Sequence, residues 1–166
     1  MIRAVQTATI IKDLIGFSGD MIVDDLLIER QQGKMTTIHK QSKLYKEINQ
    51  FKFNYKSKDP IENQLNESLL QDMVNEKFNI DKESYQALSD RSMLFVDKLV
   101  ASKYKKILVI SHCSLLTCML KSIFRIPNIN YANNCFISYM TYDEHSTNTN
   151  KFTLITAPNT DHLKMI

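Results

Sequence analysis

Apolar residues recur every three or four positions in several long stretches of the chain, which is the spacing of one face of a helix. This pattern predicts helices over residues 3–16, 61–78, 81–103 and 114–124. Gly16 follows the first stretch as a stop signal, and Asp81 is expected to cap the third. Residues 36–58 are polar and aromatic with weak periodicity, and we expect a helix followed by an irregular segment there.

Shorter apolar stretches favour strands. Lys106–Ser111 contains four consecutive apolar residues, Ile-Leu-Val-Ile, and such a run without alternation is typical of a central parallel strand covered on both faces. A short strand is expected at 21–23, and residues 135–142 and 151–156 are expected to pair across the polar loop 143–150. Helices alternating with short strands predict an α/β sandwich around a mostly parallel sheet.

Composition narrows the class of protein. The 166 residues suggest a single domain spanning 1–166, and 43% hydrophobic with 23% charged residues is ordinary for a globular chain. No stretch approaches the roughly 20 apolar residues that a membrane span needs. The net charge of +3, with lysines spread along the chain, argues against a nucleic-acid binder. The three cysteines lack metal-ligand spacing, and no export signal is found, so we expect reduced thiols and a cytoplasmic location.

The candidate chemistry lies where the apolar run meets the helix after it, at Ser111-His112-Cys113. Ligands of open α/β sheets bind beyond the carboxyl ends of strands, and the start of a helix favours an anion. One interpretation is a cysteine phosphatase loop built on Cys113. That loop needs an arginine six residues later, but Met119 stands there, and no glycine lies between them. A filler role for Cys113 is the alternative.

The other interpretation uses His112. The stretch around it resembles the V-S-H-G-G motif of the histidine phosphatase superfamily, the phosphoglycerate mutase-like family, although Cys113 and Ser114 replace the two glycines. Other segments match in family order. They are R-A-V-Q-T-A at 3–8, L-I-E-R-Q-Q-G at 27–33, Glu83-Ser84 with Arg91, Asn134 with Phe136-Ile137-Ser138, and Thr160-Asp161-His162-Leu163.

The resemblance implies a three-layer α/β sandwich with a mostly parallel central sheet flanked by helices. It also implies phosphoryl chemistry on a small phosphomonoester, carried out by histidines in a cationic pocket without a metal or cofactor. Mapped onto this chain, Arg3 binds phosphate, His112 donates to the phosphoryl oxygens, and Glu29 handles a proton. Without the resemblance, these would be a solvated arginine, a structural histidine, and a glutamate in a surface pair with Arg30.

One expected motif is not among the 166 residues. The family carries its attacking histidine in an Arg-His-Gly motif on the first strand, ahead of the segment that 3–8 resembles, and this chain has no Arg-His-Gly. His39, His145 and His162 lie in other contexts. We therefore expect an N-terminally truncated domain with weak or no turnover. Its first strand is expected to be missing, leaving an edge for a second copy or another partner to cover.

Three functions remain open. The first is a phosphatase or mutase of this family, and the poor match of residues 36–80 to the glycolytic enzymes favours the phosphatase. The second is a non-catalytic remnant that binds a phosphorylated ligand or a protein. The third is an interaction domain unrelated to phosphate, in which Arg3 and His112 would not converge. A small phosphorylated molecule is the expected ligand of the first, and neither a membrane nor a nucleic acid is expected as a partner.

Overall fold

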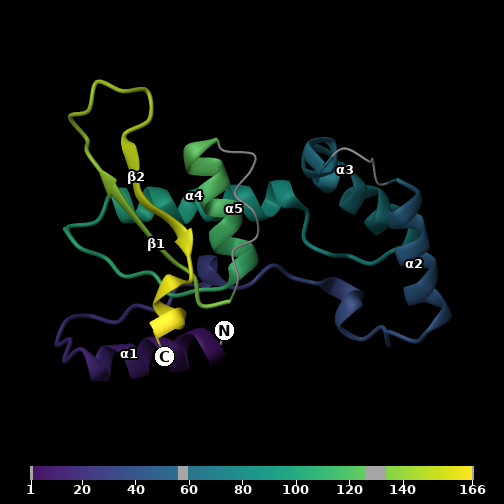
Figure 1. The fold of residues 1–166 in the computed structure, drawn as a ribbon, viewed down its shortest axis with the longest axis horizontal. Coiled ribbons are helices and arrows are strands. Elements are labelled where there is room, and N and C mark those ends of the chain that lie inside the picture. The colour runs from purple at the N-terminus through teal and green to yellow at the C-terminus, as the bar shows by residue number, and fades with distance from the viewer. Residues whose placement is uncertain (1, 56–59, 126–133, 166) are drawn as a thin grey trace. The chain divides into compact units, whose positions relative to one another are not determined.

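The computed structural model describes residues 2–55, 60–125 and 134–165. These residues form two compact units, Met1–Glu29 with Ser89–Ile166, and Arg30–Leu88. The first is called the histidine unit here, because it contains His112, and the second the insert unit. The elements are drawn in Figure 1. The single-domain organisation expected from the length stays a prediction.

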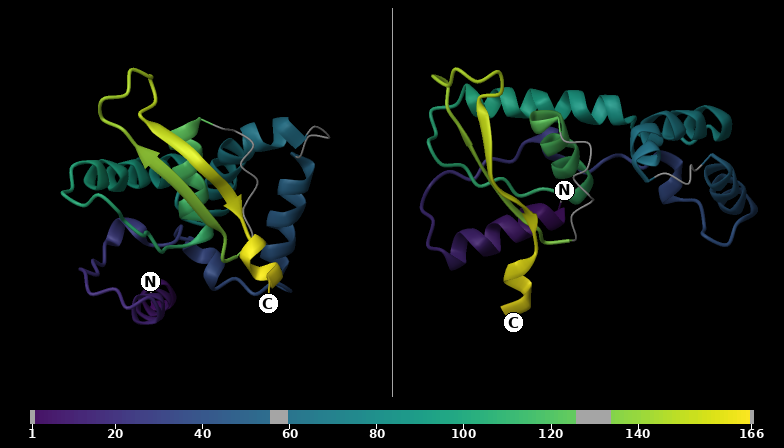
Figure 2. Two further views of the ribbon diagram at one scale, coloured as in Figure 1. Left: turned by 60° about the vertical axis from the view of Figure 1, so that its left-hand side comes forward. Right: turned by 45° about the horizontal axis from the view of Figure 1, so that its top comes forward.

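The histidine unit is built around helix α5, Cys113–Phe124. Its apolar side packs against the later part of α4, Tyr85–Val100, where Met119 and Ile123 meet Phe95 and Val96 in one buried cluster. The two-stranded sheet lies beside α5 (Figure 2) and adds Met140 and Phe152 to this cluster. The first helix, α1 (Ile2–Leu14), buries none of its side chains.

The sheet is the antiparallel hairpin predicted from the alternating pattern. Strand β1 spans Ile137–Tyr142 and strand β2 spans Phe152–Asn159, with Met140 opposite Leu154. The side-chain Nδ2 of Asn150, at the end of the connecting loop, donates to the carbonyl of Ile123 at 2.8 Å. This hydrogen bond ties the hairpin to the last turn of α5.

The insert unit contains the 3-10 turn η2 (Gly33–Thr36) and helices α2 (Lys43–Asn54) and α3 (Pro60–Phe78). Its core is Ile48, Val74 and Ile80, all fully buried. Ser42 caps α2 by accepting a hydrogen bond from the amide of Tyr45 at 3.1 Å, as a short hydroxyl side chain commonly does. The helix expected within 36–58 is therefore present.

The parallel sheet is not confirmed. Lys106–Ser111 and 21–23 were expected to be strands, but the only strands in the described residues are β1 and β2. Leu108 is 66% exposed, and the backbone of 107–110 makes no backbone hydrogen bond within the described parts of the chain. A strand needs a neighbour for its N–H and C=O groups, and composition alone does not provide one. The coarser assignment, an α/β class protein, stands.

The helix predictions are confirmed over most of their lengths, but the start of α4 is shifted. Asp81 was expected to cap this helix, and the structure shows otherwise. Asp81 has a positive φ of 57° and lies in the irregular segment before it. The cap is made three residues later, where Ser84 Oγ accepts from the amide of Ala87 at 3.1 Å.

The core of the histidine unit gives a first prediction. Phe95→Ala removes a ring that is only 7% exposed and should lower the free energy of unfolding by about 3–5 kcal/mol. The matched control is Leu94→Ala on the same helix, where the side chain is 57% exposed and the change should stay within about 0.5 kcal/mol. Urea denaturation of both variants measures the difference. Equal losses in the two variants would contradict this packing.

Candidate functional site

His112 is the residue at which the backbone turns from extended chain into α5. It is the N-cap, with φ −123° and ψ 156°, and its carbonyl accepts from the amide of Leu116 at 3.0 Å. Its side chain makes no capping hydrogen bond. The imidazole Nε2 is buried and has no hydrogen-bond partner among the residues that the structure describes. A buried nitrogen without a partner is costly, so this atom marks a place where a ligand could bind.

Burial and the charges of two predicted site residues act on the His112 imidazole. Burial is the main cause that lowers the pKa of His112 below its ordinary value. The negative charge of Glu29 opposes this shift by stabilising the imidazolium, and the positive charge of Arg3 adds to it. Both charges therefore act on the same ring. The convergence of the Arg3 and His112 head groups on one anion stays a prediction.

Arg3 lies in the first turn of α1 and is exposed. The backbone around it is ordinary helix, since Thr7 Oγ1 donates to the carbonyl of Arg3 at 2.9 Å. An exposed guanidinium that still affects a half-buried imidazole is well suited to binding a mobile anion, because its planar fork can bind two oxygens at once.

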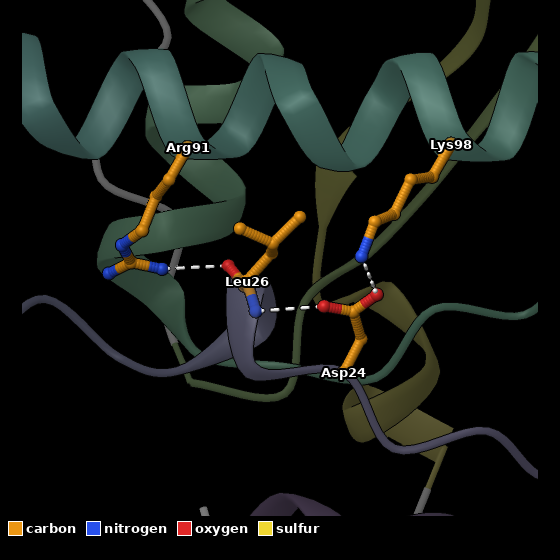
Figure 3. A network of polar contacts seen from close by, with 4 residues as sticks. All are labelled: Asp24, Leu26, Arg91 and Lys98. Atoms are coloured by element: carbon orange, nitrogen blue, oxygen red, sulfur yellow. Dashed lines mark hydrogen bonds and ion pairs between the residues drawn. The ribbon is translucent and has the colours of Figure 1, made fainter.

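Glu29 is half-buried and follows the 3-10 turn η1, Asp25–Leu27. Asp24, Lys98 and Arg91 hold this turn through polar contacts (Figure 3). Asp24 Oδ1 accepts from the amide of Leu26 at 2.9 Å, and Lys98 Nζ lies 3.0 Å from Asp24 Oδ2. Arg91 donates to the carbonyl of Leu26 at 2.7 Å. The bond from Leu26, followed by Lys98, lowers the pKa of Asp24, so this carboxylate stays charged at neutral pH.

A second link reaches the same turn from the histidine side. Ser111 Oγ donates to the carbonyl of Leu27 at 2.7 Å. Ser111 was part of the motif around His112, but the sequence assigned no role to its hydroxyl. The available signal was a hydroxyl residue that interrupts an apolar run immediately before a candidate histidine.

Other motif residues have structural tasks within the insert unit. Arg30 is 4% exposed, its Nε donates to the carbonyl of Glu83 at 2.9 Å, and its guanidinium lies 3.7 Å from the centre of the Tyr85 ring. The expectation of a surface pair between Glu29 and Arg30 is thus wrong for Arg30. Gly33 has φ +53°, and a Cβ there would collide with the carbonyls of Ile80 and Asp81. This motif needs its glycine because two backbone segments meet there.

Comparison with known families decides the relationship. The family model for the histidine phosphatase superfamily (branch 1) matches residues 1–154. This chain belongs to the histidine phosphatase superfamily. No curated protein matches it, and no solved structure does.

Membership of the histidine phosphatase superfamily agrees with the resemblance seen at 3–8, 27–33 and around His112. The roles of Arg3, Glu29 and His112 stay predictions. In the described residues, no group of three or more His, Cys, Asp or Glu side chains could hold a metal ion. None of the helices described is long and apolar enough to cross a membrane.

The charges around His112 give the second prediction. Titration of its ring by NMR should yield a pKa below the ordinary 6.5. Arg3→Gln should raise this pKa, because a nearby positive charge disfavours the imidazolium, and Glu29→Gln should lower it further. The two substitutions should leave the ring signals of His39 and His145 unchanged. Both residues are exposed, and their signals serve as internal controls. No response of His112 to either substitution would show that the three groups do not share a site.

Proposed function

We propose that the site binds the phosphoryl group of a small phosphorylated molecule. The observation that carries the proposal is the buried Nε2 of His112, which has no hydrogen-bond partner within the described residues although the charges of Glu29 and Arg3 act on the same ring. A bound phosphoryl oxygen would provide the missing partner. Membership of the histidine phosphatase superfamily supports this ligand class.

Each side chain has a defined task in this proposal. The guanidinium of Arg3 binds two phosphoryl oxygens, as bidentate arginine–phosphate pairs do. His112 donates Nε2–H to a third oxygen, and an incoming anion raises its pKa and so favours the donating form. Glu29 accepts or returns a proton on the oxygen that leaves or attacks. Fixed donors of this kind stabilise the charge that spreads over the oxygens during phosphoryl transfer.

The expected catalytic turnover is low. The family attacks phosphorus with a histidine from an Arg-His-Gly motif, and the 166 residues contain no such motif. We therefore propose that this chain binds phosphoryl groups with slow hydrolysis or none. Binding without turnover fits the phosphate-ligand remnant, and the small phosphomonoester remains the ligand in either case.

We also propose that 107–110 becomes a strand when another strand pairs with it. Ile107 and Leu108 are 45% and 66% exposed, and their backbone has no ladder partner in the described residues. An apolar segment with unpaired N–H and C=O groups is a template for strand addition. Such pairing would give the central strand that the sequence pattern predicts, and would complete a sheet ending at His112.

Binding can be measured with orthovanadate, which mimics a phosphoryl group. The chain should bind it, and Arg3→Gln and His112→Asn should each weaken binding roughly 10-fold to 100-fold, as expected for loss of a charge-assisted hydrogen bond. Lys105→Gln removes an exposed positive charge from the same unit and is the matched control.

Release of an aryl alcohol from an aryl phosphate, followed in parallel, should be slow or absent. Unchanged vanadate affinity in both site variants would contradict the proposed function. Rapid hydrolysis that is lost in His112→Asn would show that the chain is a working enzyme, and would overturn the binding-only form.

Strand addition can be tested by amide hydrogen exchange. In the dilute chain, the amides of 107–110 should exchange much faster than those of β1, which are paired with β2. Protection that grows with protein concentration would identify a second copy as the partner strand. Protection equal to that of β1 at every concentration would contradict the proposal.

A further inference from the structure

Two neighbouring carbonyls of η1 accept hydrogen bonds from distant parts of the chain. Leu26 O accepts from Arg91 and Leu27 O accepts from Ser111 Oγ, each at 2.7 Å. The two donors lie on different elements, α4 and the segment leading into α5. The turn is therefore held from two sides by side chains, and no strand ladder contributes among the residues that the structure describes.

The position of the Ser111 bond in the sequence is the important feature. Ser111 directly precedes His112, and Leu27 lies two residues before Glu29. One hydrogen bond thus joins the backbone that carries the candidate proton-handling carboxylate to the backbone that carries the candidate phosphoryl-binding imidazole. Arg91 fixes the same turn to α4, so the turn cannot follow Ser111 freely.

We propose that Ser111 is a positioning residue whose hydroxyl sets the distance between the Glu29 carboxylate and the His112 imidazole. It touches neither ligand nor reacting atoms and acts through the backbone of η1. The proposal rests on the proposed function only in that it takes Glu29 and His112 to be site residues. The hydrogen bond itself belongs to the described structure.

A purely structural role for Ser111 is the competing explanation, and the surrounding contacts disfavour it. The turn keeps its cap at Asp24, the ion pair of Asp24 with Lys98, and the Arg91 bond when the Ser111 hydroxyl is removed. Loss of one neutral hydrogen bond should therefore leave the unit folded. The segment before His112 has no strand partner in the described residues, so without the Ser111 bond it is held near η1 by the packing of Val109 against the buried cluster and not by a backbone ladder.

The charged groups acting on the His112 ring provide the readout. They are Glu29, after η1, the N-terminal amine, and Arg3, in α1. If Ser111→Ala lets Glu29 move away, the ring loses part of the interaction that favours its charged form. The pKa of His112 should then fall, in the same direction as in Glu29→Gln.

The experiment is an NMR titration of the His112 ring in the full chain, with His112→Asn used to assign its signal. Ser111→Ala should lower the pKa of His112, and Ser111→Thr, which keeps the hydroxyl, should restore it. In the Glu29→Gln background, Ser111→Ala should have no further effect, because the charge being positioned is gone. Ser102→Ala is the matched control, since it also removes a serine–carbonyl bond of 2.7 Å in the same unit, to Leu99.

Two results would overturn the proposal. One is a His112 titration that Ser111→Ala leaves unchanged. The other is a Ser111→Ala shift that is as large in the Glu29→Gln background as in the parent chain, because Ser111 would then act on the ring without Glu29. Binding of inorganic phosphate, measured on the same samples, separates this inference from the proposed function. Coupling without phosphate binding would refute the function and leave the positioning role intact.

Discussion

The candidate site depends on the anchoring of a single short turn. The carbonyls of Leu26 and Leu27 accept hydrogen bonds from Arg91 and Ser111, and the ion pair of Lys98 with Asp24 holds the residue before the turn. Arg91 and Lys98 are seven residues apart, which is two turns along one face of α4. Both side chains therefore reach η1 from one helix (Figure 3). Glu29 comes two residues after this turn in the sequence.

In this protein, side-chain hydrogen bonds position the segments that carry the candidate site residues, a role that a sheet usually performs. In most α/β proteins a backbone ladder places the ends of neighbouring strands, and the side chains at those ends form the site. In the described residues, neither 21–23 nor 107–110 has such a ladder. Hydrogen bonds from Arg91 and Ser111 position η1 relative to α4 and to the segment before α5. Each bond fixes one carbonyl only, so apolar side chains in 21–23 and 107–110 remain exposed.

The sequence was most informative where the physics is local. Helix spacing predicted α1, α3 and α5 closely, because their hydrogen bonds and apolar stripes lie within a few residues of one another. The hairpin also followed from a short-range pattern. The strand at Lys106–Ser111 did not form, because a strand depends on a partner far away in the chain. The Ser111 link spans 84 residues, so the local pattern marked the Ser111 hydroxyl but could not reveal its partner, the carbonyl of Leu27. The role of Glu29, which the motif at 27–33 indicated, stays a prediction.

The balance of charges at His112 explains how such a site can respond to an anion. Without a ligand, burial and Arg3 favour the neutral ring, while Glu29 favours the charged one. A phosphoryl group bound as proposed would add negative charge beside the ring and raise the pKa of His112, so binding would favour uptake of a proton by the ring. The imidazole then donates from Nε2, the atom left unpartnered in the described structure. In the proposed site, the negative charge of Glu29 would therefore favour ligand binding even without turnover, because it stabilises the imidazolium that forms.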